Sequence, residues 1–360
     1  MLKKTRFAWL ALLLAFGLVA AACGDDDDDA GGDGGSDDVA AEGDCPSDVE
    51  GDVDVSGSST VEPISTAVGE KLLDCSGIAA TVDGPGTGDG FKLFCAGEKD
   101  ISDASRKIKD EEAAVCEAAD IEFIELKVGF DGISVLTNPA NDAVECLNFA
   151  DLYALFGPES DGVDSWSEAQ GLAGELGSTT ELPDADLAIT APGAESGTYD
   201  SFNEIVFKDI SEARFEEKKI TEDQLETSRN DYASQADDTA IISAMEAEDA
   251  PFGFVGFAFA EEAGDEVKEL QVAPEAGTDC VEPSAETIAD GSYPISRSRY
   301  IYVNAAKAEE NPAVAGYVDY YLSDEGIASV SEVGYVDLPD DQLQASRDTW
   351  EARTVGTSAE

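Results

Sequence analysis

The sequence predicts an α/β protein, because the chain repeats a unit of strand, short polar loop and helix. In the first unit, Val53 and Val55 alternate with polar residues as in a strand, and residues 57–60 form a Ser- and Gly-rich turn. Pro63 suits the first turn of a helix, and apolar residues then recur at helical spacing through 64–72. The chain has 360 residues, of which 42% are hydrophobic, so it can form two domains of ordinary size or one large one.

Three further units follow the same plan. In the second, the apolar run 78–82 leads into the glycine-rich loop 83–90. In the third, residues 99–107 precede a helical pattern, and in the fourth the run 187–191 leads to the loop 195–198 before another helix. Such parallel units fit an α/β fold, in which ligands sit at the carboxyl ends of strands, but the sequence alone does not show that the four loops converge.

All four loops carry Ser, Thr or Gly directly before a helix. A helix N-terminus has unpaired backbone N–H groups and a positive dipole end, so hydroxyl-rich loops at several such ends suit an oxyanion. Each loop taken singly is better explained by N-capping and turn formation, and only the four together favour an oxyanion site. The glycine loop 83–90 is not a dinucleotide fingerprint, because Pro85 interrupts it, and it has no P-loop lysine.

Composition excludes several classes of protein. The chain has 79 acidic and 21 basic residues, a net charge of −58, which excludes a general nucleic-acid binder. It has no histidine, which excludes Ser-His-Asp and Cys-His catalysis and His-ligated zinc. We expect neither a metal site nor a cofactor.

The N-terminus has the features of an export signal. Lys3, Lys4 and Arg6 precede an uncharged apolar run, 7–22, that is short for a membrane span. Three alanines then precede Cys23, which resembles a bacterial lipobox, although Ala20 stands where that motif usually has Leu. The expectation is a signal peptide at 1–22, lipid on Cys23 and an acidic solvated tether at 23–45, anchored on the outer face of the cytoplasmic membrane. Plain secretion with a free Cys23 is the alternative.

The remaining six cysteines suggest disulfides in an exported chain. Six cysteines allow fifteen pairings, and free buried thiols are the alternative. We expect the pairs Cys45–Cys75, Cys95–Cys116 and Cys146–Cys280.

Several motifs occur in an order that resembles a known family. They are Gly57-Ser58-Ser59-Thr60-Val61-Glu62-Pro63, Asp100-Ile101-Ser102-Asp103-Ala104-Ser105-Arg106, Ser196-Gly197-Thr198, Tyr293-Pro294-Ile295-Ser296-Arg297 and Leu322-Ser323-Asp324-Glu325-Gly326. Together they resemble the phosphate-binding lipoproteins of bacterial phosphate ABC transporters, over about Val53 to Pro339. The resemblance implies a two-lobe periplasmic-binding-protein type II fold, with two α/β lobes joined by a two-segment hinge. Lobe one would comprise 46–135 and 296–350, and lobe two 136–295, with crossings near 135–139 and 293–302.

The resemblance also implies the ligand-binding residues. The expected set is Ser59, Thr60, Val61, Thr87, Gly88, Asp89, Ser105, Arg106, Glu195, Ser196, Gly197, Thr198 and Arg229. Thr60, the Val61 backbone N–H and Thr87 would contact the anion from lobe one, and residues 196–198 would close over it from lobe two.

The chain departs from the family pattern at two positions. Ser105 stands where one branch has an aspartate that accepts the ligand's proton, and Pro192 stands where that branch has an arginine. Asp89 or Glu195, with Asp103 behind them, would have to accept the proton instead. Arg106 and Arg229 are the candidate replacements for the arginine, although a salt bridge or a solvated loop position explains each as well.

The function that these features imply is a receptor, not an enzyme. A monomeric, lipid-anchored protein would capture inorganic phosphate by hinge closure and deliver it to the permease of an ABC transporter. The alternatives are a receptor of the same fold for sulfate, molybdate or tungstate, a secreted phosphate-ester hydrolase, and a purely structural surface lipoprotein.

Overall fold

Residues 43–360 form one compact unit. The computed structural model describes residues 45–46, 48–247 and 250–357. The expected signal peptide, Cys23 and nearly all of the expected tether lie outside the described residues. In the part that is described, no helix is both long and apolar enough to cross a membrane.

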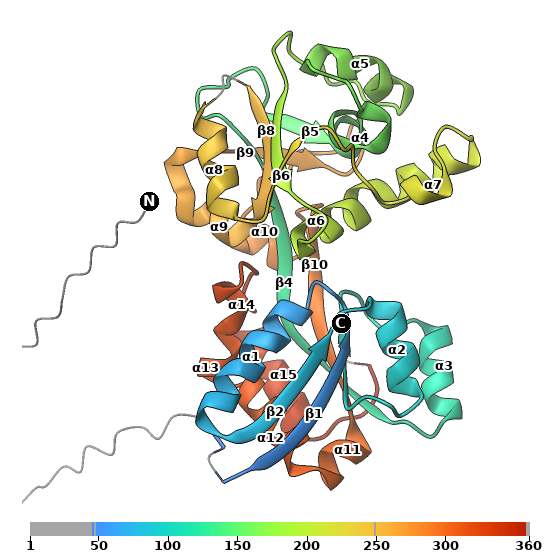
Figure 1. The fold of residues 1–360 in the computed structure, drawn as a ribbon, viewed down its shortest axis with the longest axis vertical. Helices are drawn as coiled ribbons and strands as arrows, with labels where there is room; N and C mark the ends of the chain where they lie inside the picture. Colours follow the sequence, from blue (N-terminus) through green and yellow to red (C-terminus); the bar gives the residue numbers. More distant parts are fainter. Residues whose placement is uncertain (1–44, 47, 248–249, 358–360) are drawn as a thin grey trace, which may run out of the picture. The chain divides into compact units, whose positions relative to one another are not determined.

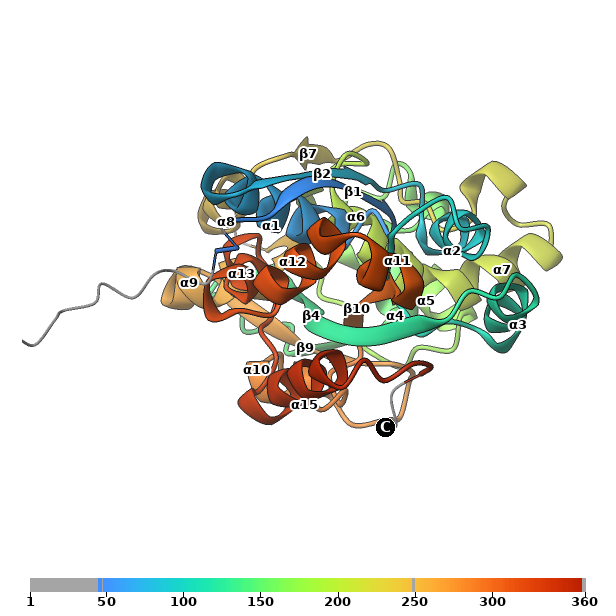
Figure 2. The ribbon, with the colours of Figure 1, turned by 90° about the horizontal axis from the view of Figure 1, so that it is seen from below.

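One half of the unit, here called lobe one, is built on the parallel strands β1 (Glu50–Gly57), β2 (Gly77–Asp83) and β3 (Ile101–Ala104). These strands follow the predicted order of strand, loop and helix. The helices of lobe one are α1 (Glu62–Cys75), α2 (Thr87–Cys95), α3 (Asp110–Ala118), α11 (Ala305–Glu310), α12 (Pro312–Tyr321), α13 (Asp324–Ile327), α14 (Ser329–Glu332) and α15 (Asp340–Glu351). Figure 2 shows α15 on one side of the long strand β4 (Phe123–Thr137), and α1 and α12 on the other.

The other half, lobe two, contains a parallel set in which β6 (Ala188–Pro192) pairs with β7 (Ala233–Gln235) and β8 (Pro251–Gly256). A second parallel pair joins β5 (Cys146–Asn148) to β9 (Lys268–Ala273). Its helices are α4 (Phe149–Phe156), α5 (Trp166–Glu175), α6 (Gly197–Phe202), α7 (Lys208–Glu216), α8 (Asp238–Ala247), α9 (Phe257–Ala263) and α10 (Ala285–Ala289). Short helical turns lie at η1 (Pro158–Ser160), η3 (Glu222–Gln224) and η4 (Gly264–Glu266), and the π-helix η2 (Asn203–Phe207) joins α6 to α7.

Two long strands connect the lobes, β4 (Phe123–Thr137) and β10 (Ser296–Asn304), which pair antiparallel along their length (Figure 1). β10 also pairs with β3 of lobe one, whereas β4 continues to β8 and β9 of lobe two. Along β4, Val128 packs in the core of lobe one and Phe130 in the core of lobe two. The change of core therefore falls upstream of the crossing expected at 135–139. A register shift between Arg299 and Tyr300 marks the same place, as expected where a bulge increases strand twist.

Three disulfides stabilise the two lobes. They join Cys45 to Cys75, Cys95 to Cys116 and Cys146 to Cys280, the same pairs as expected from the sequence. The last bond closes a separation of 134 residues within lobe two. Among the described residues, no group of three or more Cys, Asp or Glu side chains is placed to hold a metal ion.

Candidate functional site

Three loops of lobe one converge at the carboxyl ends of β1, β2 and β3. Backbone hydrogen bonds join them, from the Gly86 N–H to the Gly57 carbonyl at 2.8 Å and from the Ser58 N–H to the Asp103 carbonyl at 2.9 Å. The hydroxyls of Thr87 and Ser105 lie 3.0 Å apart. Parallel strands end at one sheet edge, so loops distant in sequence meet there. This convergence is what the sequence could suggest but not demonstrate.

The close packing of these loops requires glycine at position 57. Its φ is +156°, and a β-carbon there would lie 2.1 Å from the Asp103 carbonyl oxygen. No side chain fits at that distance, and the backbone angle is one that L-residues rarely adopt. Gly57 therefore lets the first loop lie directly against the end of β3.

The Ser196-Gly197-Thr198 loop of lobe two faces these loops. Ser196 caps helix α6 by accepting a 3.2 Å hydrogen bond from the Thr198 N–H, as an N-cap serine does. A β-carbon on Gly197 would lie 3.5 Å from both the Thr60 Cα and the Ser59 carbonyl oxygen. The Ser59 hydroxyl also donates a 3.3 Å hydrogen bond to the carboxylate of Asp200 on α6. Loops from both lobes thus meet at one place.

Most of the expected ligand-binding residues lie on or beside these converging loops, which together form the group of residues at the meeting point of the two lobes. Ser59, Thr60, Thr87, Ser105, Ser196, Gly197 and Thr198 lie on the converging loops, and Gly88 lies beside Arg106. The Thr60 hydroxyl lies 2.9 Å from the hydroxyl of Ser58, a residue outside the expected set. The group is therefore rich in hydroxyl donors, as the sequence predicted.

Val61 is a correction to the expected set. Its side chain is fully buried in the core of lobe one. Its backbone N–H, expected to contact the ligand, instead donates a 3.1 Å hydrogen bond to the Ser58 carbonyl. This bond closes the turn that starts α1, so the Val61 N–H is already used in this conformation.

Arg106 lies beside the glycine loop but its charge is compensated. Its two terminal nitrogens bond both carboxylate oxygens of Glu112, each at 2.8 Å. Glu112 raises the pKa of Arg106, and Arg106 together with the Lys109 N–H lowers the pKa of Glu112 despite its burial. Such a bidentate pair fixes the guanidinium in one orientation.

Three of the expected charged residues lie elsewhere. Asp89 is exposed on α2 and pairs with Lys92 at 2.7 Å, and Glu195 is exposed, so neither carboxylate is held inside the group. Arg229 is buried within lobe two, where it bonds Asp231 at 2.6 and 2.9 Å and the carbonyls of Leu155 and Val163. Arg229 therefore holds loops of lobe two together, rather than facing the loops of lobe one.

Asp103 is the acid that lies beneath the loops. Its side chain is fully buried, with Oδ1 accepting a 2.9 Å hydrogen bond from the Ser65 hydroxyl. Its Oδ2 is buried without a hydrogen-bond partner among the described residues. Burial raises the pKa of Asp103 to about 8, and the nearby carboxylates of Glu62 and Asp83 add to the rise. Of the three candidate acids, only Asp103 is enclosed by this site.

A cluster of charged residues lies under helix α6, and the sequence did not predict it as part of the site. Arg297 of β10 pairs with Glu204 at 2.6 Å, and Arg299 of β10 bonds the Ser201 hydroxyl at 3.0 Å and the Asp131 carboxylate. Although burial opposes its ionisation, Arg297 lowers the pKa of Glu204. Two arginines in one short strand segment of a very acidic chain were the available signal.

Comparison with known proteins shows which family this chain belongs to. A family model described as a PBP superfamily domain matches residues 40–325. The chain belongs to this family. It is 33% identical over 318 residues to Protein SphX of Synechocystis sp., covering 87% of this chain and 86% of that protein. It is 32% identical over 308 residues to the phosphate-binding protein PstS of Staphylococcus aureus, covering 85% of this chain and 84% of that protein.

Solved structures of the family agree with the observed fold. A possible phosphate binding protein from Planctomyces limnophilus superposes with a TM-score of 0.74 at 31% identity, covering 85% of this chain and 99% of that one. The predicted α/β periplasmic-binding-protein fold is therefore confirmed, and with it the class of binding proteins rather than enzymes.

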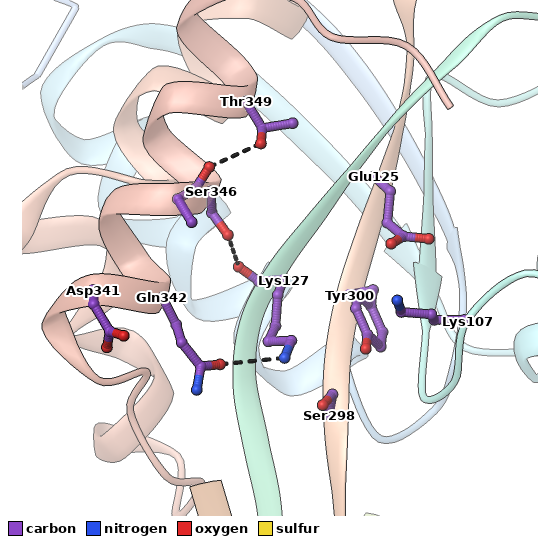
Figure 3. Close-up of a pocket in the computed structure, with 10 residues that line it drawn as sticks. Lys107, Glu125, Lys127, Ser298, Tyr300, Asp341, Gln342, Ser346 and Thr349 are labelled. Atoms are coloured by element: carbon purple, nitrogen blue, oxygen red, sulfur yellow. Dashed lines mark hydrogen bonds between the residues drawn. The ribbon is translucent and has the colours of Figure 1, made fainter. Parts of the chain in front are cut away.

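A separate pocket lies on the outer side of lobe one, between α15 and the strands β4 and β10 (Figure 3). It has a volume of about 570 Å³. Lys127 in its wall donates a 3.2 Å hydrogen bond to Gln342, and the buried carboxylate of Glu125 accepts one from Tyr302 at 2.6 Å. None of the loop residues described above lines this pocket. Lys127, Glu125 and Ser346 in its wall form hydrogen bonds within the fold. The converging loops instead present hydroxyls from both lobes.

Proposed function

We propose that this protein is an extracytoplasmic receptor that captures inorganic phosphate between its lobes and delivers it to the permease of an ABC transporter. The observation that carries the proposal is the meeting of donor-rich loops from both lobes, where Gly197 lies against Thr60. Relatives named phosphate-binding protein PstS, and the solved structure of similar sequence that is described as a possible phosphate binding protein, support phosphate as the ligand.

The proposed binding residues are those that the two lobes bring together: Ser59, Thr60, Thr87, Gly88, Ser105, Ser196, Gly197 and Thr198, with Arg106 beside them. Hydroxyl and amide donors can hold an oxyanion by hydrogen bonds alone, and bonds to a charged group are the stronger kind. This suits a chain whose net charge of −58 would otherwise repel anions.

The proposed mechanism is closure of the two lobes about β4 and β10. Phosphate would bind first to the loops of lobe one, taken as 46–135 with 296–350. The Ser196–Thr198 loop of lobe two, taken as 136–295, would then add its donors and exclude water. Closure of this kind is a hinge motion, and the closed form is what a permease would recognise.

Titration calorimetry of the purified protein with phosphate and with sulfate tests the proposal. We expect heat of binding with phosphate and much weaker binding of sulfate, because the protonated oxygen of phosphate can donate to an acceptor oxygen of the site, such as the Ser59 carbonyl, whereas sulfate has no proton to donate. Equal binding of sulfate would favour a receptor for another oxyanion. A protein that binds neither anion would refute the proposal.

The proposed location is the outer face of the cytoplasmic membrane, through lipid on Cys23. The motivation is the Ala-Ala-Ala-Cys23 sequence behind the charged and apolar leader. We expect Cys23→Ser to release the protein from membranes in a fractionation experiment. A mature protein whose mass shows an N-terminus other than a lipidated Cys23 would refute the anchor.

A further inference from the structure

Two arginines of the hinge strand β10 lie directly under helix α6. Both bond the Ser201 hydroxyl, Arg299 at 3.0 Å and Arg297 at 3.3 Å from their Nη2 atoms. Ser201 lies one turn after Gly197 on the same helix, because residues four apart share a helix face. The guanidinium groups therefore lie one helical turn from the loop that faces lobe one.

Tyr335 connects Arg299 to that loop. The Arg299 guanidinium carbon lies 5.6 Å from the centroid of the Tyr335 ring. The hydroxyl of Tyr335 would lie 3.4 Å from a β-carbon on Gly197, which itself faces Thr60. The side chain of Tyr335 thus lies between Arg299 and the point where the two lobes meet.

The hydrogen-bonding capacity of Arg299 is only partly used. The residue has no exposed surface, and its Nε and Nη1 are buried without a hydrogen-bond partner among the described residues. Arg214, which is 4% exposed in lobe two, instead uses Nε, Nη1 and Nη2 on glutamates 159, 175 and 217. Buried donors are normally paired, so the unpaired nitrogens of Arg299 call for an acceptor.

The other arginines near the site also form ion pairs, and Arg297 has one buried nitrogen, Nε, without a hydrogen-bond partner among the described residues, whereas Arg299 has two. Arg106 bonds both oxygens of Glu112, and Arg297 pairs with Glu204. Burial lowers the pKa of Arg299 to about 10, partly offset by Asp131, so its guanidinium stays charged at neutral pH. Arg299 is therefore a charged group with unused donors beside a site that presents mainly neutral hydroxyls.

We infer that Arg299 supplies the guanidinium that binds the anion held between the lobes, through the nitrogens that are unpaired in this conformation. The inference rests on the proposed function, since it names the cation of the same site. A guanidinium donates to oxyanions as a planar fork, which suits the tetrahedral oxygens of phosphate.

Calorimetry with inorganic phosphate on the wild type, Arg299→Gln and Arg299→Lys tests the inference. We expect Arg299→Gln to lose about tenfold to a hundredfold in affinity, and Arg299→Lys, which keeps the charge but not the fork, to lose less. Arg214→Gln is the matched control, because it removes a buried arginine of α7 whose guanidinium nitrogens all bond carboxylates. We expect its affinity to match the wild type even if it unfolds more easily.

Asp131→Asn gives a readout that a purely structural role would not produce. Removing this carboxylate leaves the charge of Arg299 uncompensated, so phosphate should bind a few-fold more tightly. In the wild type, the Nε–H signal of Arg299 in an NMR spectrum, assigned from its loss in Arg299→Lys, should shift when phosphate is added. This last measurement remains informative if the glutamine variant fails to fold.

Two results would overturn the inference: wild-type affinity in folded Arg299 variants, or an Nε–H signal that phosphate leaves unmoved. Weaker or unchanged binding by folded Asp131→Asn would also count against it. If the wild type itself binds no phosphate, the proposed function fails. If the wild type binds and the Arg299 variants bind equally, only the inference fails.

Discussion

The Ser59 hydroxyl donates a hydrogen bond to the Asp200 carboxylate at 3.3 Å, which joins the first loop of lobe one to helix α6 of lobe two. Burial raises the pKa of Asp200, and the nearby Glu204 adds to the rise. When it is ionised, the Asp200 carboxylate still places a negative charge at the point where the two lobes meet. It should oppose a bound anion while its hydrogen bond favours contact between the lobes.

Replacing Asp200 separates these two effects. We expect Asp200→Asn to raise phosphate affinity about threefold, because a unit charge at this range contributes a fraction of a kcal/mol at water-like dielectric. The gain should shrink with added salt, which screens exposed charges. Asp89→Asn, an exposed change on α2, should leave the affinity unaltered. A loss of affinity in Asp200→Asn would mean instead that this carboxylate accepts a hydrogen bond from phosphate.

The hydroxyls on the facing loops should each contribute to binding. We expect Ser196→Ala and Thr60→Ala to weaken phosphate binding by about tenfold or more, the value of a hydrogen bond to a charged group. Ser165→Ala is the matched control for Ser196, because Ser165 is also an N-cap, on helix α5. It should lower stability without changing calorimetric affinity. Unchanged affinity in both site variants would place the ligand elsewhere.

The buried carboxyl of Asp103 predicts a dependence of stability on pH. Its pKa is raised by burial to about 8, whereas an unfolded aspartate titrates near 4. Between these values the unfolded chain has released the proton and the folded chain keeps it, so the free energy of unfolding should fall as pH rises. The contribution is fully present below about pH 4 and is lost as pH passes about 8.

Asp103→Asn should remove this dependence. Asparagine resembles the neutral carboxylic acid, so the variant should match the wild type near pH 4 and become the more stable of the two by about pH 8. Urea unfolding across that range measures the difference. Asp74→Asn, at an exposed position, is the control. A constant difference between Asp103→Asn and wild type would show that Asp103 is ionised in the folded protein.

The bond between Cys146 and Cys280 predicts a stability effect confined to lobe two. It closes a separation of 134 residues, and constraining a long loop in the unfolded chain stabilises the fold by typically about 2–4 kcal/mol. The double variant Cys146→Ser with Cys280→Ser should therefore unfold at lower denaturant concentration. Phosphate affinity should persist where the protein remains folded. Equal unfolding midpoints for the variant and wild type would contradict this account.

Local patterns in the sequence were sufficient to predict the order of strand, loop and helix, but not the convergence of the loops. Alternating valines at Val53 and Val55 and the capping serine at Ser196 depend on neighbours in the chain, so they were visible without a structure. The pairing of Cys95 with Cys116 spans only 21 residues, and the observed pairs match those expected.

The charged residues of the site were harder to predict. Their roles depend on the direction in which each side chain points and on partners that are far away in the sequence. Asp89 and Glu195 lie beside site residues in the sequence, but their side chains are exposed. Arg229 was expected to bind the anion, but its guanidinium bonds the Asp231 carboxylate and two backbone carbonyls. Arg299 reaches Ser201 across 98 residues, a contact that only the folded hinge creates.

The position of bound phosphate in a crystal structure of the complex tests the central claim most directly. We predict a phosphate enclosed between the lobes, within hydrogen-bond distance of donors from the loops at Thr60, Thr87 and Ser105 and from Ser196–Thr198. Phosphate found only at the outer pocket beside Lys127, or bound to one lobe without any contact to the other, would contradict the account.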